Sequence, residues 1–244
     1  MTIRFDVSLT PEQLATLAGT DPRWWFTRFE FANGASPIHP HVATLEQANR
    51  WKLGMVEPWL RRLAPGARVL DVFCANGAFS YEAARAGARS VLGVDYDPPR
   101  IECARFTLGL LDGALPVRAR FEVANVYRLP EAVQGPFDLT LALGGLYHVA
   151  DPALVLKNLR AVTTGHLILQ TARIIRWPPG SWAKFVTVRR RVDRQDGIAG
   201  VWKLTPGAVD AMLRYAGFEV VERLPVPRRK GRRIPWYGAV CRAV

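Results

Sequence analysis

The chain has 244 residues, of which 49% are hydrophobic, so it is long enough for one domain with additions and its own core. Its formal charge of +12 comes largely from arginines spread along the chain, which fits either a solvated basic surface or contact with nucleic acid or another anionic surface. The sequence contains no apolar run of about 18 residues and no secretory leader at its start, which excludes a transmembrane helix and predicts a cytoplasmic protein.

The first elements are a helix and a strand-like stretch. Thr10 followed by Pro11 is typical of a helix N-terminus and predicts a helix over residues 8–18. Alternating apolar residues over 24–31 indicate strand-like pieces. Trp25, in this stretch, is a candidate substrate contact.

The segment His39-Pro40-His41 contains a His-x-His pair, but no further Cys or His ligand lies near it in the sequence, so we predict no metal site. His39 is instead a candidate for the mouth of a substrate pocket. Residues 45–63 have an amphipathic pattern that predicts a helix, broken at Gly54 or at Pro58.

The stretch from Arg68 to Ser80 reads as a buried strand, a tight loop and the start of a helix. Asp71 lies near the end of the strand, where an open α/β sheet places its ligands. Small residues follow it, which lets the backbone turn sharply and approach a ligand closely. The helix is expected over about 79–86, with its N-terminal amides pointing toward the same ligand.

A second strand is predicted over 90–94 and ends in Asp95, which lies about 20 residues after the loop, where a βαβ unit presents a carboxylate to a ribose. The pair predicts a site for a nucleoside cofactor, with Tyr96 as a candidate cover for the adenine. Two glycine patterns compete for the loop. The dinucleotide pattern G-x-G-x-x-G finds no glycine, whereas the pattern acid-x-G-x-G-x-G is matched by Asp71 and Gly77, with Phe73 and Ala75 in place of the other glycines.

Two more motifs follow. Residues 121–130 look like a strand that leaves into a polar loop at Asn125, and residues 137–143 form a buried strand followed by Gly144. In this order and spacing the four motifs resemble S-adenosylmethionine (SAM) dependent class I methyltransferases. The resemblance implies SAM as the cofactor, held by Asp71, Phe73, Ala75, Asn76, Gly77, Asp95, Tyr96, Asn125, Val126, Leu143 and Gly144.

A narrower resemblance rests on Leu146-Tyr147-His148, Trp51-Lys52 and Trp24-Trp25-Phe26, which are similar to the bacterial tRNA wobble-uridine carboxymethyltransferase group. In those enzymes a Lys after Trp, the Tyr of Leu-Tyr-His and an Arg on the last strand hold the extra carboxylate of carboxy-SAM. Lys52 and Tyr147 match, but Tyr237 stands where that Arg is expected. Val149-Ala150-Asp151-Pro152 likewise replaces their Arg-Arg-Ser-Pro, so the resemblance implies a relative that transfers a plain methyl group.

The remaining pattern completes a Rossmann-like α/β fold, a doubly wound and mostly parallel sheet whose last strand is antiparallel. Helices are predicted over 151–162 and from Pro206 to Tyr215, and Leu154 is expected on the buried side of the first of them. Strands are predicted over 166–171, 218–224 and 236–241, and the basic turn 227–233 joins the last two. Residues 174–200, rich in Pro, Gly, Trp and Arg, are expected to insert after the fifth strand. The predicted organisation is an N-terminal cap (1–63), the cofactor core (64–173), a substrate cap (174–200) and the end of the core sheet (201–244).

The chemistry then centres on His148, the preferred general base, because histidine takes up a proton near neutral pH and follows the fourth core strand. Tyr147 is the second catalytic candidate. Lys52 is a candidate to hold an acceptor carboxylate or phenolate, and further substrate contacts are expected from Trp25, His39, Trp182 and Tyr237. Three functions remain open: a methyltransferase for small-molecule hydroxyl, carboxyl or amine acceptors; an RNA methyltransferase with tRNA as its partner; and a non-catalytic nucleoside-binding protein.

Overall fold

A computed structural model describes residues 2–36, 42–111, 118–172, 174–175, 177–189 and 198–244 of the chain. The chain divides into two compact units, Met1–Ala124 and Asn125–Val244. No helix in the described ranges is long and apolar enough to cross a membrane.

The first unit begins with two parallel strands, β1 (Thr2–Phe5) and β2 (Arg28–Phe31), joined through helix α1 (Pro11–Ala18) and the short helix η1 (Pro22–Trp24). The start of α1 is confirmed: Oγ1 of Thr10 accepts a hydrogen bond from the backbone N–H of Gln13, whose side chain returns a bond to the N–H of Thr10. The pairing of β1 with β2 was not predicted, and it turns every second side chain of both strands inward.

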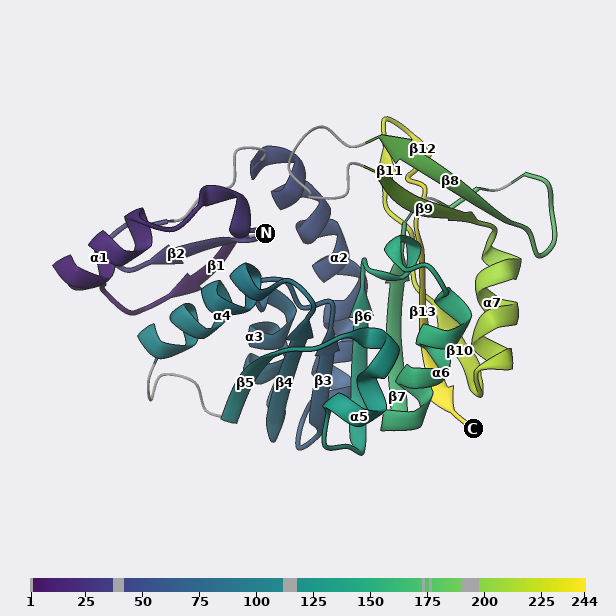
Figure 1. The fold of residues 1–244 in the computed structure, drawn as a ribbon, viewed down its shortest axis with the longest axis horizontal. Coiled ribbons are helices and arrows are strands. Elements are labelled where there is room, and N and C mark those ends of the chain that lie inside the picture. The colour runs from purple at the N-terminus through teal and green to yellow at the C-terminus, as the bar shows by residue number, and fades with distance from the viewer. Residues whose placement is uncertain (1, 37–41, 112–117, 173, 176, 190–197) are drawn as a thin grey trace. The chain divides into compact units, whose positions relative to one another are not determined.

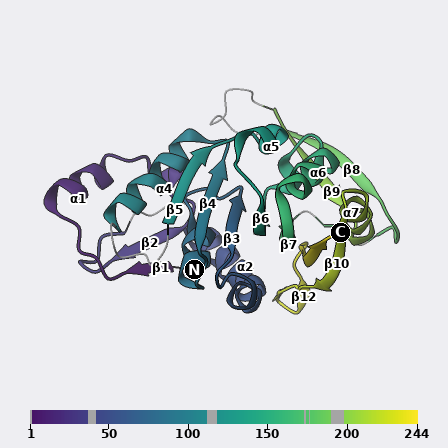
Figure 2. The same ribbon diagram turned by 90° about the horizontal axis from the view of Figure 1, so that it is seen from below.

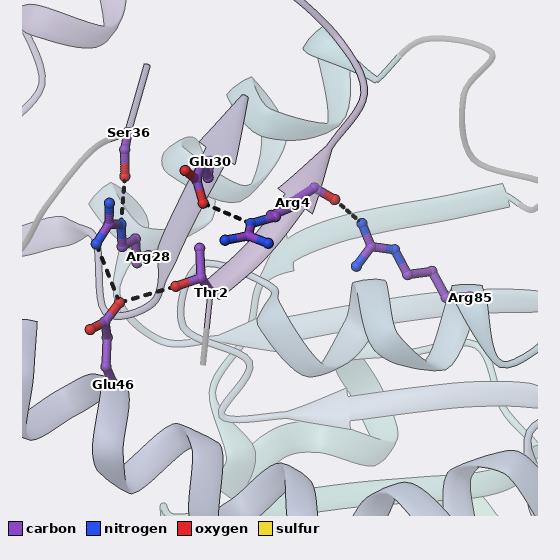
Figure 3. A network of polar contacts seen from close by, with 7 residues as sticks. All are labelled: Thr2, Arg4, Arg28, Glu30, Ser36, Glu46 and Arg85. Carbon is purple, nitrogen blue, oxygen red and sulfur yellow. Dashed lines mark hydrogen bonds and ion pairs between the residues drawn. The ribbon is translucent and has the colours of Figure 1, made fainter. Parts of the chain in front are cut away.

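A network of polar contacts fastens these strands to two helices of the same unit (Figure 3). Arg4 on β1 binds Glu30 on β2 at 2.9 Å, and Oγ1 of Thr2 donates to Glu46 of helix α2 (Val42–Leu63) at 3.1 Å. Arg85 of helix α3 (Ala78–Arg85) donates to the backbone carbonyl of Arg4. Exposed pairs of this kind each contribute at most about 1 kcal/mol, so their effect is to fix orientation more than to stabilise.

Helix α2 (Val42–Leu63) is continuous, so the predicted break at Gly54 or Pro58 is wrong. Pro58 lies inside the helix, where it removes one N–H donor to the carbonyl of Gly54 without ending the helix.

The cofactor-type strands of the first unit are those predicted. Three parallel strands lie side by side in the order β3, β4, β5, and helices α3 and α4 pack on them (Figures 1 and 2). The elements are β3 (Arg68–Val72), α3 (Ala78–Arg85), β4 (Ser90–Asp95), α4 (Pro98–Leu110) and β5 (Arg118–Val123).

The second unit contributes four strands in the order β10, β13, β7, β6. Strands β6 and β7 are parallel, and β13 runs antiparallel to both β7 and β10, which confirms the predicted antiparallel last strand of a mostly parallel Rossmann-like fold. The elements are η2 (Val126–Arg128), α5 (Leu129–Ala132), β6 (Phe137–Leu143), η3 (Leu146–His148), α6 (Pro152–Val162), β7 (Thr163–Thr171), α7 (Pro206–Tyr215), β10 (Phe218–Arg223) and β13 (Tyr237–Ala243).

Two hairpins decorate this unit. Strand β8 (Ala183–Arg189), within the predicted insertion 174–200, pairs with β9 (Ile198–Leu204), which begins at its end. The basic turn forms the short hairpin β11 (Arg228–Arg229) and β12 (Arg232–Arg233). The predicted caps hold: Asp151 accepts from the N–H of Leu154 and Thr205 from that of Ala208. Leu154 itself, predicted to be in the buried stripe of α6, is 41% exposed.

Candidate functional site

The loop after β3 has a left-handed backbone at every second residue. The φ angles of Phe73, Ala75 and Gly77 are 65°, 50° and 84°. These are the three positions at which the pattern acid-x-G-x-G-x-G carries glycine, so the loop keeps the glycine conformation although two side chains are present. An L-residue in this region costs roughly 1–2 kcal/mol, which the surrounding structure must offset.

The close packing beneath this loop explains the glycine that remains. A Cβ atom on Gly77 would lie 2.6 Å from Cζ of Phe121 on β5, and one on Gly93 of β4 would lie 2.6 Å from the same ring. The Phe121 ring is itself 3% exposed and packs against Tyr81. The loop therefore sits on an aromatic floor that leaves no room for a methyl group at Gly77.

Asp95 ties the loop to the end of β4. Its Oδ2 accepts a hydrogen bond from the backbone N–H of Ala75 at 2.9 Å, and its Oδ1 accepts one from Asp97 at 3.1 Å. Burial raises the pKa of this carboxyl group, whereas Arg100 and the two N–H donors oppose that rise. Next to it, Tyr96 is 57% exposed, as a residue that covers a ligand would be.

Asp71 and Lys52 are both buried in the first unit and attract each other electrostatically. Burial raises the pKa of Asp71 to about 7, although the hydroxyl of Ser80 donates to its Oδ2 at 2.7 Å. Burial likewise lowers the pKa of Lys52 to about 8. The Lys52 ammonium lies 5.8 Å from the ring centre of Phe26 and 5.7 Å from that of Phe79, within the range of cation–π attraction.

Asn76 joins the cofactor loop to the N-terminal strands. Its side chain is fully buried, and its Nδ2 donates to the carbonyl of Thr27 at 3.2 Å. Asn49 of α2 holds the same segment by donating to Phe26 O and to Thr27 Oγ1. The Oδ1 of Asn76 has no hydrogen-bond partner among the described residues, so an acceptor atom is left inside the loop.

In the second unit, the loop after β6 carries the predicted catalytic pair. Gly144 has a φ of 101° and its N–H donates to the carbonyl of Gln170 on β7, which sets the start of the loop behind the buried Leu143. The rings of Tyr147 and His148 lie against each other with centres 3.9 Å apart, and His148 is exposed. An exposed imidazole at this strand end can exchange a proton with solvent or with a bound acceptor.

Tyr127, which the sequence analysis did not single out, links the loops after β5 and β6. Its hydroxyl accepts hydrogen bonds from the N–H groups of Ala150 and Asp151. The predicted Asn125 is exposed and accepts from the N–H of Tyr127, and Asn158 donates to the carbonyls of Val126 and Tyr127. The only sequence signal for this role is an aromatic hydroxyl in a polar loop.

The β8–β9 hairpin reaches the same loop through Trp202. The Nε1–H of Trp202 donates to the carbonyl of Ala150 at 3.2 Å, and its ring packs against Phe185, which is 46% exposed. The predicted Trp182 is 57% exposed and its Nε1–H bonds instead to the carbonyl of Pro179. Trp202, which was not predicted, therefore makes the contact with the loop of His148, whereas the predicted Trp182 bonds to Pro179.

Three other predicted substrate residues have different outcomes. Trp25 is 1% exposed, donates to Oγ1 of Thr20 and packs on Phe29, which makes it a core residue of the first unit. Tyr237 is 3% exposed and its hydroxyl donates to Asp210 at 2.5 Å. His39 lies outside the described residues.

The unpartnered buried polar atoms share one kind of position. In the described part of the chain, the buried side-chain oxygens and nitrogens without a hydrogen-bond partner are Oδ1 of Asn76, both polar atoms of Gln170, and Oγ1 of Thr171. Asn76 follows β3, and the other two end β7. Ligands of Rossmann-like sheets bind at the carboxyl ends of the strands. A ligand bound there would supply the hydrogen-bond partners that these atoms lack.

The cysteines fit structural positions. Cys74, Cys103 and Cys241 are free and buried. Burial raises the pKa of all three thiols, to about 12 for Cys103 and Cys241, so none is activated as a nucleophile. Cys74 fills buried space in the cofactor loop.

Known proteins with similar sequences include methyltransferases of two kinds. The ubiquinone biosynthesis O-methyltransferase of Bordetella bronchiseptica is 30% identical over 179 residues, covering 73% of this chain and 60% of that protein. The tRNA U34 carboxymethyltransferase of Ectopseudomonas mendocina is 33% identical over 190 residues, covering 76% and 54%. The chain therefore spans little more than half the length of these relatives.

Solved structures show the same fold. The N-terminal domain of EvdMO1, solved with SAH and D-fucose, is 24% identical with a TM-score of 0.63, covering 96% of this chain and 95% of that one. Magnesium protoporphyrin IX methyltransferase from Synechocystis, solved with SAM, is 14% identical with a TM-score of 0.63, covering 97% and 99%. The model of the family described as a methyltransferase domain matches residues 63–207. The chain therefore belongs to the methyltransferase domain family, which confirms the predicted resemblance to methyltransferases.

Proposed function

We propose that the protein transfers the methyl group of SAM to an oxygen or nitrogen atom of a small-molecule acceptor. The observation that supports this most directly is the left-handed backbone at Phe73, Ala75 and Gly77. Two non-glycine residues are held in this conformation at an energetic cost, which a requirement for the loop geometry accounts for. That loop geometry is the one that lets a backbone approach a nucleoside cofactor.

The residues of the first unit suit SAM chemically. The unpartnered Oδ1 of Asn76 is an acceptor for the ammonium group of a methionine moiety. Asp71 lies near the end of β3, the strand that leads into the loop of Asn76. Asp95 would bind ribose hydroxyls, with exposed Tyr96 against the adenine. Bound SAM supplies an electrophilic methyl group on a sulfonium centre.

The side chains that would serve the acceptor include His148 of the second unit and Lys52 of the first. His148 would accept the proton of an acceptor hydroxyl as the oxygen becomes bonded to the methyl carbon, and Tyr147, stacked on it, would fix the imidazole ring. Lys52 would hold an anionic oxygen of the acceptor, because its lowered pKa reflects a buried ammonium that gains from a further negative partner. Residues 1–63 and 174–200 are proposed as caps over the substrate, and the protein as cytoplasmic.

Calorimetric titration tests the cofactor. We expect the protein to bind SAM and SAH, and to bind carboxy-SAM and NAD at least tenfold more weakly. Asp95→Asn should weaken SAM binding about tenfold or more, whereas the neighbouring Asp97→Asn, which keeps the Ala75 contact with Asp95, should stay within about twofold. A wild-type protein that binds neither SAM nor SAH would end the proposal.

A second candidate function, methylation of RNA, is favoured by the β11–β12 hairpin. In its register, Arg228 stands directly opposite Arg233. Like charges in facing positions destabilise a hairpin, and phosphates bound between them would reverse the effect. The tRNA U34 relative named above makes tRNA the natural probe.

Salt-dependent binding separates the two candidates. If RNA is the substrate, Arg228→Gln with Arg233→Gln should weaken tRNA binding and lower the slope of log K against log salt by about 2. Arg118→Gln with Arg120→Gln is the matched control, because these two arginines of β5 are exposed and their replacement removes the same charge. Equal effects of the two pairs would mean that tRNA responds only to the overall charge.

A further inference from the structure

Gln170 is a fully buried carboxamide without a hydrogen-bond partner among the described residues. It is 0% exposed, and neither its Nε2 nor its Oε1 is paired. In the strand register its neighbours are Leu143 on β6 and Gly238 on β13, which offer no polar side chain.

Such a group is expensive to keep. A carboxamide carries two N–H donors and a carbonyl acceptor, and each buried polar group left unpaired costs roughly 1–3 kcal/mol. Buried unpaired groups in native proteins are few, and one with two unpaired atoms calls for a specific cause. Methionine would fill the same volume at this position without that cost.

The position of Gln170 indicates the cause. Its carbonyl accepts the N–H of Gly144, so the residue anchors the start of the loop that carries Tyr147 and His148. It is the last residue but one of β7, at the carboxyl end where ligands of these sheets bind. The backbone of Gln170 therefore lies next to the loop of the proposed acceptor site, within the second unit.

We propose that Gln170 determines acceptor specificity by pairing with a neutral cis-amide edge, in which an N–H donor stands beside a C=O acceptor. The inference rests on the proposed function and names its substrate class. A carboxamide presents its own donor and acceptor side by side, so an edge with the opposite order satisfies both atoms. A carboxylate offers only acceptors and leaves Oε1 unpaired, and a plain amine leaves Nε2 unpaired.

Two sources carry this edge: a small lactam or imide, and the uracil base of an RNA. The recognition chemistry is the same, so the residue can be tested with both. The probes are 2-pyridone for the small lactam, a uridine-containing RNA stem-loop for the base, and benzoate as a flat ligand that has acceptors only.

Thr171 provides a matched control from the same strand end. Its Oγ1 is also buried and unpartnered, but successive strand residues face opposite sides of the sheet. It pairs in register with Tyr237, whose hydroxyl is bonded to Asp210 of α7. Thr171→Val thus removes an unpaired polar atom on the other face, and Gln170→Met removes the two on the proposed acceptor face.

The experiment measures probe binding by ligand-observed NMR on the SAH-loaded protein, with thermal unfolding of the same samples. Wild type should bind at least one amide probe about tenfold more tightly than benzoate. Gln170→Met should lose that preference about tenfold while unfolding at an equal or higher temperature, and Thr171→Val should keep it within about twofold. Binding of 2-pyridone assigns a small lactam, and binding of the stem-loop alone assigns an RNA base.

Three results would overturn the inference: no amide probe binds, benzoate binds as well, or Gln170→Met raises the unfolding temperature and leaves binding unchanged. In the last case Gln170 would be a structural residue with an internal water. Titration of SAH into the same samples keeps the two claims apart. If SAH binds and the probes do not discriminate, only the role of Gln170 falls; if wild type does not bind SAH, the methyltransferase proposal falls first.

Discussion

Replacing Gly77 by alanine should destabilise the first unit more than any other glycine-to-alanine change in a left-handed turn. Two terms add. The φ of 84° costs an alanine about 1 kcal/mol. The new Cβ would lie 2.6 Å from Cζ of Phe121, and because that ring is buried against Tyr81, making room adds about 1–3 kcal/mol. The expected loss is therefore about 2–4 kcal/mol.

A matched control separates the two terms. Gly66 also has a left-handed φ, of 72°, but no atom lies within 4 Å of where its Cβ would be. Gly66→Ala should then cost only the conformational term, about 1 kcal/mol. The free energies of unfolding are measured by urea denaturation followed by circular dichroism and tryptophan fluorescence.

A double-mutant cycle then tests the contact itself. In a Phe121→Leu background the smaller side chain gives way, so Gly77→Ala should cost about as little as Gly66→Ala. The coupling energy between positions 77 and 121 is expected to be about 1–3 kcal/mol. If Gly77→Ala costs no more than Gly66→Ala in the wild-type background, the aromatic floor under the loop does not exist.

Three further changes test other contacts. The pKa of Asp71 is about 7 in the folded protein and about 4 in the unfolded chain, so the free energy of unfolding should fall by about 1.4 kcal/mol per pH unit between these values. Asp71→Asn should abolish this slope in urea titrations from pH 4.5 to 8. An unchanged slope would contradict the assignment. Thr205→Ala should lower the stability by about 1–3 kcal/mol, because the hydroxyl caps α7 and also donates to the carbonyl of Gly180. Thr10→Ala, at the exposed start of α1, should lower it by about 1 kcal/mol. Thermal melting compares the two variants, and equal losses would count against the extra bond. Tyr237→Phe should lose about 1–2 kcal/mol in urea and leave SAM binding unchanged, since its hydroxyl bonds only within the second unit; a large loss of SAM affinity would instead return Tyr237 to the binding site.

Local patterns were enough for the elements whose information is local. The strand at 68–72, the helix after it and the acid at 95 follow from a buried run, small residues and spacing, and the caps at Thr10 and Thr205 follow from a single side-chain bond each. These features depend on residues within one turn or one βαβ unit.

What the sequence missed depends on partners far along the chain. Strand β1 exists because it pairs with β2, whose first residue comes 26 positions later, and a four-residue run carries too little pattern to announce it. The hydroxyl of Tyr127 finds the N–H of Asp151 only after folding. At the cofactor loop, counting glycines understated the match, because Phe73 and Ala75 adopt the glycine conformation that their side chains disfavour.

The three buried thiols give the chain an internal reporter of its own opening. Cys74 and Cys103 lie in the first unit and Cys241 in the second, and each is at most 5% exposed. A thiol reagent can modify them only when the surrounding structure opens, so the rate at which each one is labelled measures how often its neighbourhood unfolds. Mass spectrometry after timed labelling would therefore follow the two units separately, and would show which of them SAH holds shut, without a single engineered residue.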